Sequence, residues 1–221
     1  VKFKSEGGSL EDFLKRAIGP VVGLYSAQSE EDAANDTKDA VLYGFGRIGR
    51  SILRILAKDP NGFELVGIND IEPLETCAYL FEFDSVFGPW KWSVETNAEA
   101  LILDGHSIPF HHERDITKLD LSDVDVVLEC TGMAGGRSVE ERGLIAGAKS
   151  VLVSGPSKAA DVTLVMGANE EQLGDHTLVS NASCTTNCAA PMIKIIDKLC
   201  GIENGFLSTI HSYTSVQNLH D

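Results

Sequence analysis

Residues 40–50 read AVLYGFGRIGR, an apolar run that passes directly into a glycine-rich turn. The run of consecutive apolar residues is typical of a strand buried on both faces of a parallel sheet. The turn has the spacing G-x-G-x-x-G, formed by Gly44, Gly46 and Gly49, and the apolar residues after it recur at helical spacing. A strand, this turn and a helix in that order form the first half of a dinucleotide-binding βαβ unit.

Residues 63–68 predict the second strand of the unit, and Asp70 follows its end. In such a unit Gly44 permits the tight turn, Gly46 lets the backbone approach a pyrophosphate, and Gly49 lets helix and strand pack closely. Asp70 would accept hydrogen bonds from ribose hydroxyls and repel a 2′-phosphate, which favours NAD over NADP. The alternative is a glycine-rich turn without a ligand, in which Asp70 caps a helix.

Strict alternation of strands and helices is interrupted between residues 72 and 125. Residues 90–95, 100–103 and 108–111 are strand-like, and Asp104-Gly105 is a favourable two-residue hairpin turn. We therefore expect an inserted antiparallel piece.

Parallel strands return with a buried run at residues 124–130, followed by a helix over 138–148 and strands over 150–154 and 163–166. The carboxyl ends of strands, where open α/β sheets bind ligands, then carry Thr131, Gly132 and Ser154. The predicted fold class is α/β, with a Rossmann-type doubly wound parallel sheet.

A second informative sequence is SNASCTTNC at residues 180–188, between a short predicted strand and an apolar helix that stops at Gly201. Cys184 therefore lies at a helix N-terminus, which favours the thiolate and can lower a cysteine pKa from its usual value of roughly 8.5. The alternative is a small, buried structural cysteine. Four polar neighbours favour a nucleophile, because capping one helix does not need them all: Ser183, Thr185, Thr186 and Asn187.

A nucleophilic cysteine needs a base or a cationic partner, and histidine is the usual one. Residues 205–214 alternate in part like a strand of a different, mixed sheet, and this strand carries His211. Taken alone, a strand histidine is more often structural than catalytic.

The composition excludes several classes of protein. A formal net charge of -15 argues against nucleic acid or an anionic membrane as the main partner. The sequence has neither an apolar run of about 20 residues nor a signal peptide, and five cysteines in that context fit a reducing compartment. We therefore expect a cytoplasmic protein. Cys184 and Cys188 share a helix face, but without further ligands at suitable spacing we expect no metal site.

From residue 40 to its end the chain resembles the phosphorylating glyceraldehyde-3-phosphate dehydrogenases. The motifs that carry the resemblance are GFGRIGR at 44–50, Asn69-Asp70, Asp84-Ser85-Val86, Glu113-Arg114-Asp115, residues 183–187 and residues 211–214. The resemblance implies NAD-dependent oxidation and phosphorylation of glyceraldehyde 3-phosphate to 1,3-bisphosphoglycerate, in glycolysis or gluconeogenesis, by a homotetramer.

The resemblance also implies roles for individual residues. Cys184 would be the nucleophile that forms a thiohemiacetal and then a thioester, and His211 would activate it. Ser183 and Thr185 would hold inorganic phosphate, and Thr214 the phosphate of the substrate. The implied NAD contacts are Arg47 and Ile48 at the pyrophosphate, Asp70 at the ribose, Arg114 beside the adenine, and Ser154 at the nicotinamide.

The chain departs from the family pattern at Phe87, where a histidine is usual, and at Val216, where an aspartate is usual. We expect three regions: an N-terminal extension (1–39) with one amphipathic helix and an acidic linker, an NAD-binding domain (40–183), and the start of an α+β catalytic domain (184–221). The first residue, Val1, and the missing second half of the family pattern indicate a fragment of a longer chain.

Three alternatives remain open from the sequence. The first is a dehydrogenase of erythrose 4-phosphate, although Thr214 favours the triose. The second is a non-catalytic NAD-sensing or scaffold protein, against which the presence of both Cys184 and His211 argues. The third is a semialdehyde dehydrogenase, which the two threonines after Cys184 disfavour.

Overall fold

The structure is a computed structural model, and it describes residues 37–58, 62–133 and 136–211. The predicted N-terminal helix and most of the acidic linker lie outside the described residues, as do Thr214 and Val216.

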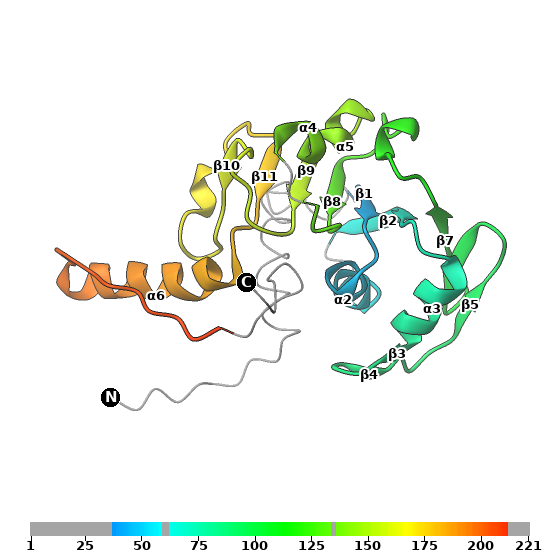
Figure 1. Cartoon of the computed structure of the whole chain (residues 1–221), viewed down its shortest axis with the longest axis horizontal. Coiled ribbons are helices and arrows are strands. Elements are labelled where there is room, and N and C mark those ends of the chain that lie inside the picture. Colours follow the sequence, from blue (N-terminus) through cyan, green and yellow to red (C-terminus); the bar gives the residue numbers. More distant parts are fainter. Residues whose placement is uncertain (1–36, 59–61, 134–135, 212–221) are drawn as a thin grey trace, which may run out of the picture.

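A large, mostly parallel sheet forms the centre of the described chain (Figure 1). Its strand order is β10-β11-β9-β8-β1-β2-β7-β6-β5, so the chain winds outward from β1 in both directions. This is the predicted doubly wound arrangement, and the point where the order reverses is where such sheets bind ligands. The parallel strands are β1 (Lys38–Tyr43), β2 (Phe63–Asn69), β8 (Val126–Glu129), β9 (Ser150–Val153), β10 (Val162–Thr163) and β11 (Leu178–Ser180).

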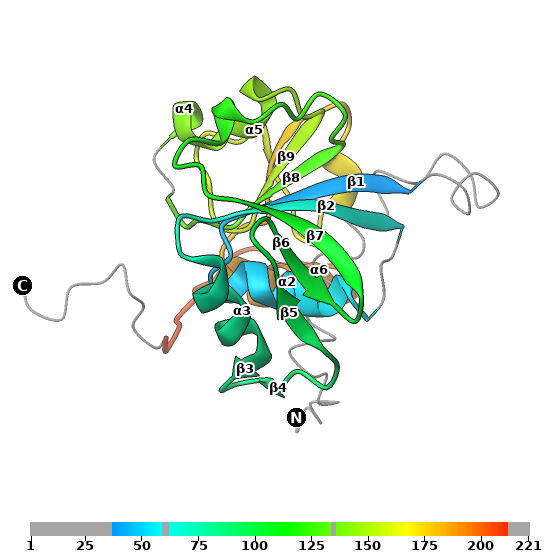
Figure 2. The same ribbon diagram turned by 90° about the vertical axis from the view of Figure 1, so that its right-hand side faces the viewer.

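The predicted antiparallel insertion is confirmed and extends this sheet (Figure 2). It consists of β5 (Val94–Thr96), β6 (Ala100–Leu103) and β7 (His106–His111). Asp104 and Gly105 turn the chain with φ values of 50° and 83°, as the left-handed residues of a two-residue hairpin do. Because β7 also pairs with β2 in parallel, the insertion adds to the edge of the main sheet.

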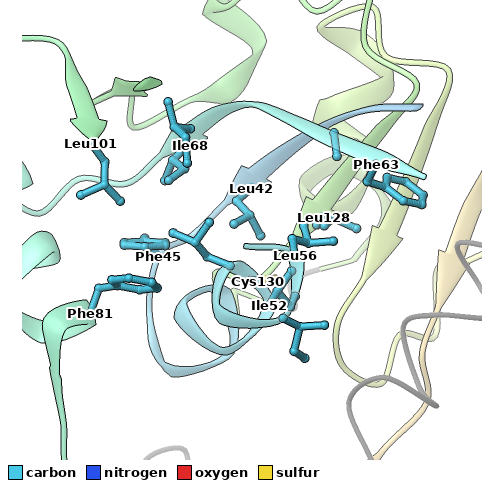
Figure 3. Close-up of a cluster of buried hydrophobic side chains, with 14 of the residues drawn as sticks. Leu42, Phe45, Ile52, Leu56, Phe63, Ile68, Phe81, Leu101, Leu128 and Cys130 are labelled. Carbon is cyan, nitrogen blue, oxygen red and sulfur yellow. The ribbon is translucent and has the colours of Figure 1, made fainter. Parts of the chain in front are cut away.

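Both faces of the sheet are covered by apolar clusters, since alternate side chains of each strand point to opposite faces. Ala40 and Leu42 pack with the cluster on the side of α2 (Arg47–Leu56) and α3 (Leu74–Glu82). Val41 and Tyr43 pack on the other side, in a cluster that includes Ile116 of η1 (Ile116–Lys118) and Leu144 of α5 (Arg142–Ile145). The short helix α4 (Arg137–Glu140) precedes α5. Figure 3 shows the first cluster, in which Phe45 and Phe81 stack with 6.2 Å between ring centroids.

Arg54 is the unexpected member of the buried face of α2, with only 7% of its surface exposed. Its guanidinium lies over the rings of Phe81, Trp90 and Phe87, at 5.1, 5.3 and 5.9 Å from their centroids, and donates to the carbonyl of Phe81. Such cation–π contacts compensate for burying the charge. Phe87, which departs from the family pattern, therefore forms one wall of this arginine site, next to the hairpin of β3 (Phe83–Asp84) and β4 (Gly88–Pro89).

Three predicted elements are shorter than expected. The strand predicted over 90–95 begins only at Val94, as β5. The helix predicted over 138–148 is divided into α4 and α5 at Glu141, whose ψ of 3° departs from helical geometry. The strand predicted over 163–166 contributes only Thr163 to β10. The ladder ends because the amide N–H of Val165 donates to the side chain of Asn169 at 2.8 Å rather than to a neighbouring strand. The remaining short helical element is η2 (Glu170–Gln172).

The last described part of the chain leaves the sheet (Figure 1). α6 (Cys184–Cys200) runs away from it, and the only buried residue of α6 is Ala189. The strand predicted over 205–214 is wrong for residues 205–211, which form neither helix nor strand and are exposed. A strand needs a neighbour for its backbone hydrogen bonds, and the described residues offer none here. In the part of the chain that the structure describes, we find no helix with the length and apolar character needed to span a membrane.

Candidate active site

The glycine turn after β1 has the geometry that its sequence predicts. Gly44 adopts φ +95°, and a Cβ placed there would lie 2.6 Å from the backbone nitrogen of Thr131. At Gly49 a Cβ would lie only 2.2 Å from the carbonyl oxygen of Gly44, so only glycine lets α2 approach the turn this closely. At Gly46, by contrast, a Cβ would meet no atom within 4 Å, so this side of the turn is open.

The start of α2 is suited to an anion. Its N-cap residue is Gly46, so no side chain caps the helix, and the first turn carries no acidic residue. The backbone N–H groups at a helix N-terminus favour phosphate groups. The first turn also holds Arg47 and Ile48, both exposed, and their side chains line a groove on the side of Asp84 and Phe87.

Asp70 is held in place by backbone donors. One carboxylate oxygen accepts from the N–H of Phe45 at 2.5 Å, and the other accepts from the N–H of Glu72 at 2.9 Å. Each carboxylate oxygen has a second lone pair that can accept another hydrogen bond. Asp70 is thus fixed directly beside the glycine turn, where the ribose of a dinucleotide is expected.

Arg114 is brought to the same place by buried polar contacts that the sequence did not reveal. Asn69 is fully buried, and its amide donates to the carbonyl of Glu113 at 2.8 Å and accepts from its N–H at 3.0 Å. The hydroxyl of Tyr43 donates to the carbonyl of Arg114 at 3.3 Å. These contacts tie the segment after β7 to the ends of β1 and β2.

A cleft of about 510 Å³ lies between these segments. Its lining includes Gly44, Gly46, Asp70, Arg114 and Thr131, five of the residues predicted to bind the cofactor. The sequence reasoning missed further residues of this lining, because their positions gave no motif: Tyr43, Glu72, Met133 and Arg142. The backbone of Gly132 follows Thr131 with φ +71°.

The carboxyl edge of the sheet places the other predicted residues in a row. The strands β1, β8, β9 and β11 are neighbours, so the glycine turn and the end of β11 are three strand spacings apart, about 14 Å. Ser154 follows β9, and its N–H donates to the carbonyl of Glu129 at 2.9 Å. The N–H of Asn181 donates to the carbonyl of Val153 at 2.9 Å, so the turn that leads to Cys184 starts beside Ser154.

That turn is fixed by buried hydroxyl and amide groups. Ser180 is fully buried, and its hydroxyl donates to the carbonyl of Gly155 at 2.9 Å and accepts from the N–H of Ala182 at 3.2 Å. Ala182 adopts a left-handed φ of 58°, uncommon for a residue other than glycine. The amide of Asn187 donates to the carbonyls of Asn181 at 2.6 Å and Ser183 at 3.0 Å. The direction in which α6 starts is therefore set before Cys184.

Cys184 is the first residue of α6, and its Sγ lies 3.0 Å from Nε2 of His211. The hydrogen bond with His211 is the main cause that lowers the pKa of the Cys184 thiol, and hydrogen bonds from Thr185 act in the same direction. Partial burial opposes them. The thiolate is the form that attacks carbonyl carbons, so this pair can supply a nucleophile and a proton acceptor.

The buried cysteines behave in the opposite way. Burial raises the pKa of Cys77 and of Cys130 to about 12. Both lie in the apolar core, where they act as small hydrophobic side chains.

Of the residues predicted to hold phosphate, the structure describes Ser183 and Thr185, whereas Thr214 lies outside the described residues. The hydroxyl of Ser183 accepts from the N–H of Thr186 at 3.1 Å, so it serves as the N-cap of α6. Thr185 lies next to the Cys184 sulfur. Within the described ranges, no three histidine, cysteine or acidic side chains are grouped so that they could hold a metal ion.

Comparison with known proteins agrees with these features. Residues 39–137 match the family model described as "Glyceraldehyde 3-phosphate dehydrogenase, NAD binding domain", and residues 183–221 match the corresponding "C-terminal domain".

Curated relatives are named glyceraldehyde-3-phosphate dehydrogenase. The chain is 46% identical over 178 residues to glyceraldehyde-3-phosphate dehydrogenase of Xanthobacter flavus, a match that covers 79% of this chain and 53% of that protein. It is 44% identical over 182 residues to the enzyme of Thermotoga maritima, covering 80% and 55% of the two chains. For the enzyme of Geobacillus stearothermophilus the identity is 41%, covering 80% and 54%. The chain thus spans about half the length of the curated relatives it matches.

Proposed function

Because this chain belongs to the glyceraldehyde-3-phosphate dehydrogenase family, we propose that it supplies the NAD site and the nucleophile of an enzyme that oxidises and phosphorylates glyceraldehyde 3-phosphate. The observation that carries the proposal is the 3.0 Å contact between Cys184 and His211, at the same sheet edge as the glycine turn. The relatives are glyceraldehyde-3-phosphate dehydrogenases, which supports this choice of aldehyde.

The residues of the cleft fit a dinucleotide. Gly46 leaves the turn open, the uncapped start of α2 offers N–H groups to a pyrophosphate, and Asp70 is oriented to accept from a ribose. Arg114, which lines the cleft, would contact the adenine, and Ser154 at the end of β9 would contact the nicotinamide. When bound, NAD supplies the acceptor for the hydride that leaves the substrate carbon.

Cys184 begins the reaction as a thiolate whose sulfur attacks the aldehyde carbon. A carbon–sulfur bond forms as the carbonyl π bond opens, and the carbonyl oxygen takes a proton from the imidazolium of His211, which gives a thiohemiacetal. Nε2 of His211, placed against the sulfur, takes the hydroxyl proton as the carbon loses its hydride, which leaves a thioester on Cys184. An oxygen of inorganic phosphate then attacks the thioester carbon and gives up its proton to solvent, and Cys184 leaves again as a thiolate. The products are an acyl phosphate, NADH and one proton.

Ser183 and Thr185, which precede and follow Cys184 in the sequence, are the proposed contacts of the attacking phosphate. The Ser183 hydroxyl accepts from the N–H of Thr186 and lies 2.8 Å from the Thr186 hydroxyl, so it can donate its own proton to a phosphate oxygen when the Thr186 hydroxyl donates to it. Thr214 is the proposed contact of the substrate phosphate, and residues 184–221 form the first part of the catalytic domain. We also propose a cytoplasmic homotetramer that acts in glycolysis or gluconeogenesis. Measurement of the molecular size in solution tests the tetramer.

The first test follows all five cysteines in one experiment. The full chain is alkylated with iodoacetamide between pH 5.5 and 9, and each cysteine is followed by peptide mass spectrometry. Because its pKa is lowered, Cys184 should label fastest, and its lead over Cys77 and Cys130 should be greatest at low pH. NAD or substrate should change the Cys184 rate alone.

The second half of the test is phosphate-dependent formation of NADH from glyceraldehyde 3-phosphate, with erythrose 4-phosphate for comparison. If Cys184 labels no faster than Cys188 in the folded chain, the hypothesis that Cys184 is an activated thiol fails. A non-catalytic NAD-binding role is then the better interpretation. A higher rate on erythrose 4-phosphate would replace the proposed aldehyde.

A further inference from the structure

We propose that Arg142 is a further cofactor-binding residue, whose guanidinium packs against the adenine of the dinucleotide. This inference rests on the proposed NAD function. It assigns a role to a residue that belongs to neither the glycine turn nor the cysteine site.

Arg142 reaches the cleft from a different part of the fold than the predicted binding residues. It is the first residue of α5, in the connection between β8 and β9, whereas Arg114 follows β7. Both arginines line the same cleft of about 510 Å³, together with Asp70 and Glu72. Two cationic and two anionic side chains from three segments therefore converge where the adenosine is expected.

The acidic side of the cleft is fixed for recognition of a ribose. Both carboxylate oxygens of Asp70 accept backbone N–H groups, so this carboxylate cannot turn toward an arginine without losing those bonds. A 2′-phosphate beside Asp70 would meet a negative charge held in place. The two arginines are therefore better explained by the adenine ring than by a second phosphate.

Arg142 is available for a ligand in a way that a neighbouring arginine is not. Among the described residues its ion pair is with Asp115, at 4.0 Å between Nε and Oδ1, the outer limit of such a contact. Arg137, in the preceding helix, has Nε 3.0 Å from Glu141 and Nη1 2.7 Å from Asp161. Arg137 is thus held on the protein surface by two short ion pairs. Arg142 has one long ion pair, so its guanidinium is less constrained.

The chemistry of a guanidinium suits an adenine ring. A planar, weakly hydrated cation stacks on aromatic faces and gains from the electrons of the ring. Stacking between arginine and a base also requires no fixed hydrogen-bond pattern. Arg142 would therefore add affinity for the adenylate half of the cofactor and leave the nicotinamide half untouched.

Calorimetric titration of the full chain with NAD, 5′-AMP and nicotinamide mononucleotide tests the inference without any turnover. Arg142→Ala should weaken the binding of NAD and of 5′-AMP by the same factor, about 3- to 10-fold, as expected for the loss of one stacked cation. Affinity for nicotinamide mononucleotide should not change. Arg142→Lys keeps the charge but loses the plane, so it should stay closer to the alanine variant than to the unaltered chain.

Arg137→Ala is the matched control, because it removes an arginine close in sequence that does not line the cleft, and it should leave all three affinities unchanged. Equal affinity of Arg142→Ala and the unaltered chain for NAD would overturn the role of Arg142 while leaving the proposed function intact. A loss of affinity in Arg142→Ala that is seen with NADP and not with NAD would also overturn the role of Arg142. If the unaltered chain binds neither NAD nor 5′-AMP, it is the proposed NAD site that fails.

Discussion

The adenosine cleft and the Cys184–His211 pair lie at the same edge of one sheet but are built in different ways. The cleft is part of the core: Gly44 packs against the backbone of Thr131, and fully buried Asn69 links two of its segments. Cys184 and His211 are both exposed, 27 residues apart in sequence, and come together through a side-chain contact at the start of α6. Changes in the cleft should therefore affect stability, whereas changes at the pair should affect chemistry alone.

The largest expected effect is that of His211→Ala. Loss of a positioned base should slow hydride transfer by roughly 10²- to 10⁴-fold. Because His211 is exposed, the free energy of unfolding should change by less than about 0.5 kcal/mol. Single-turnover formation of NADH and urea denaturation of the full chain measure the two quantities.

His106→Ala is the control, since His106 is exposed at the start of β7 on a different part of the sheet. It should leave both quantities unchanged. A His211→Ala variant that keeps its full rate would remove His211 from the mechanism, and one that unfolds more easily would mean that the pair belongs to the core after all.

A smaller effect is expected from adding one methyl group to the glycine turn. At Gly49 the new Cβ would lie 2.2 Å from the carbonyl of Gly44, so the backbone must shift and the free energy of unfolding should fall by about 2–3 kcal/mol. At Gly46 the same methyl meets nothing within 4 Å, so Gly46→Ala should cost less than about 1 kcal/mol. Because Gly46→Ala fills the side of the turn that faces the cofactor, it should weaken NAD binding. Urea denaturation and NAD titration of both variants test this, and equal stability losses would refute the assigned glycine roles.

The smallest effect is expected on α6. Leu199 is 79% exposed, so Leu199→Ser should change the free energy of unfolding by less than about 0.5 kcal/mol. Leu128, in β8, is only 3% exposed, and Leu128→Ala should cost about 2–5 kcal/mol. Urea denaturation of both variants makes the comparison. A loss above about 1 kcal/mol for Leu199→Ser would show that this face of α6 is covered in solution.

Local sequence was a good guide where a rule depends on a few adjacent residues. The glycine turn, the Asp104-Gly105 hairpin and the start of α6 at Cys184 each follow from backbone preferences that act within a few positions. Where distant residues compete, the same reasoning failed. The strand predicted at 163–166 ends early because Asn169 takes the N–H of Val165, and residues 205–211 lack the neighbour that a strand requires.

The sequence by itself determined the doubly wound α/β fold, the glycine turn with Asp70, and the thiol at a helix N-terminus, because each is encoded in short patterns of apolar, glycine and polar residues. Only the tertiary structure decided what comes together across the chain. It placed Nε2 of His211 against the sulfur of Cys184, used Asn69 to hold Arg114 beside Asp70, and brought Arg142 to the same cleft. These contacts join segments that are far apart in sequence, and strand order and loop packing set them rather than any local preference.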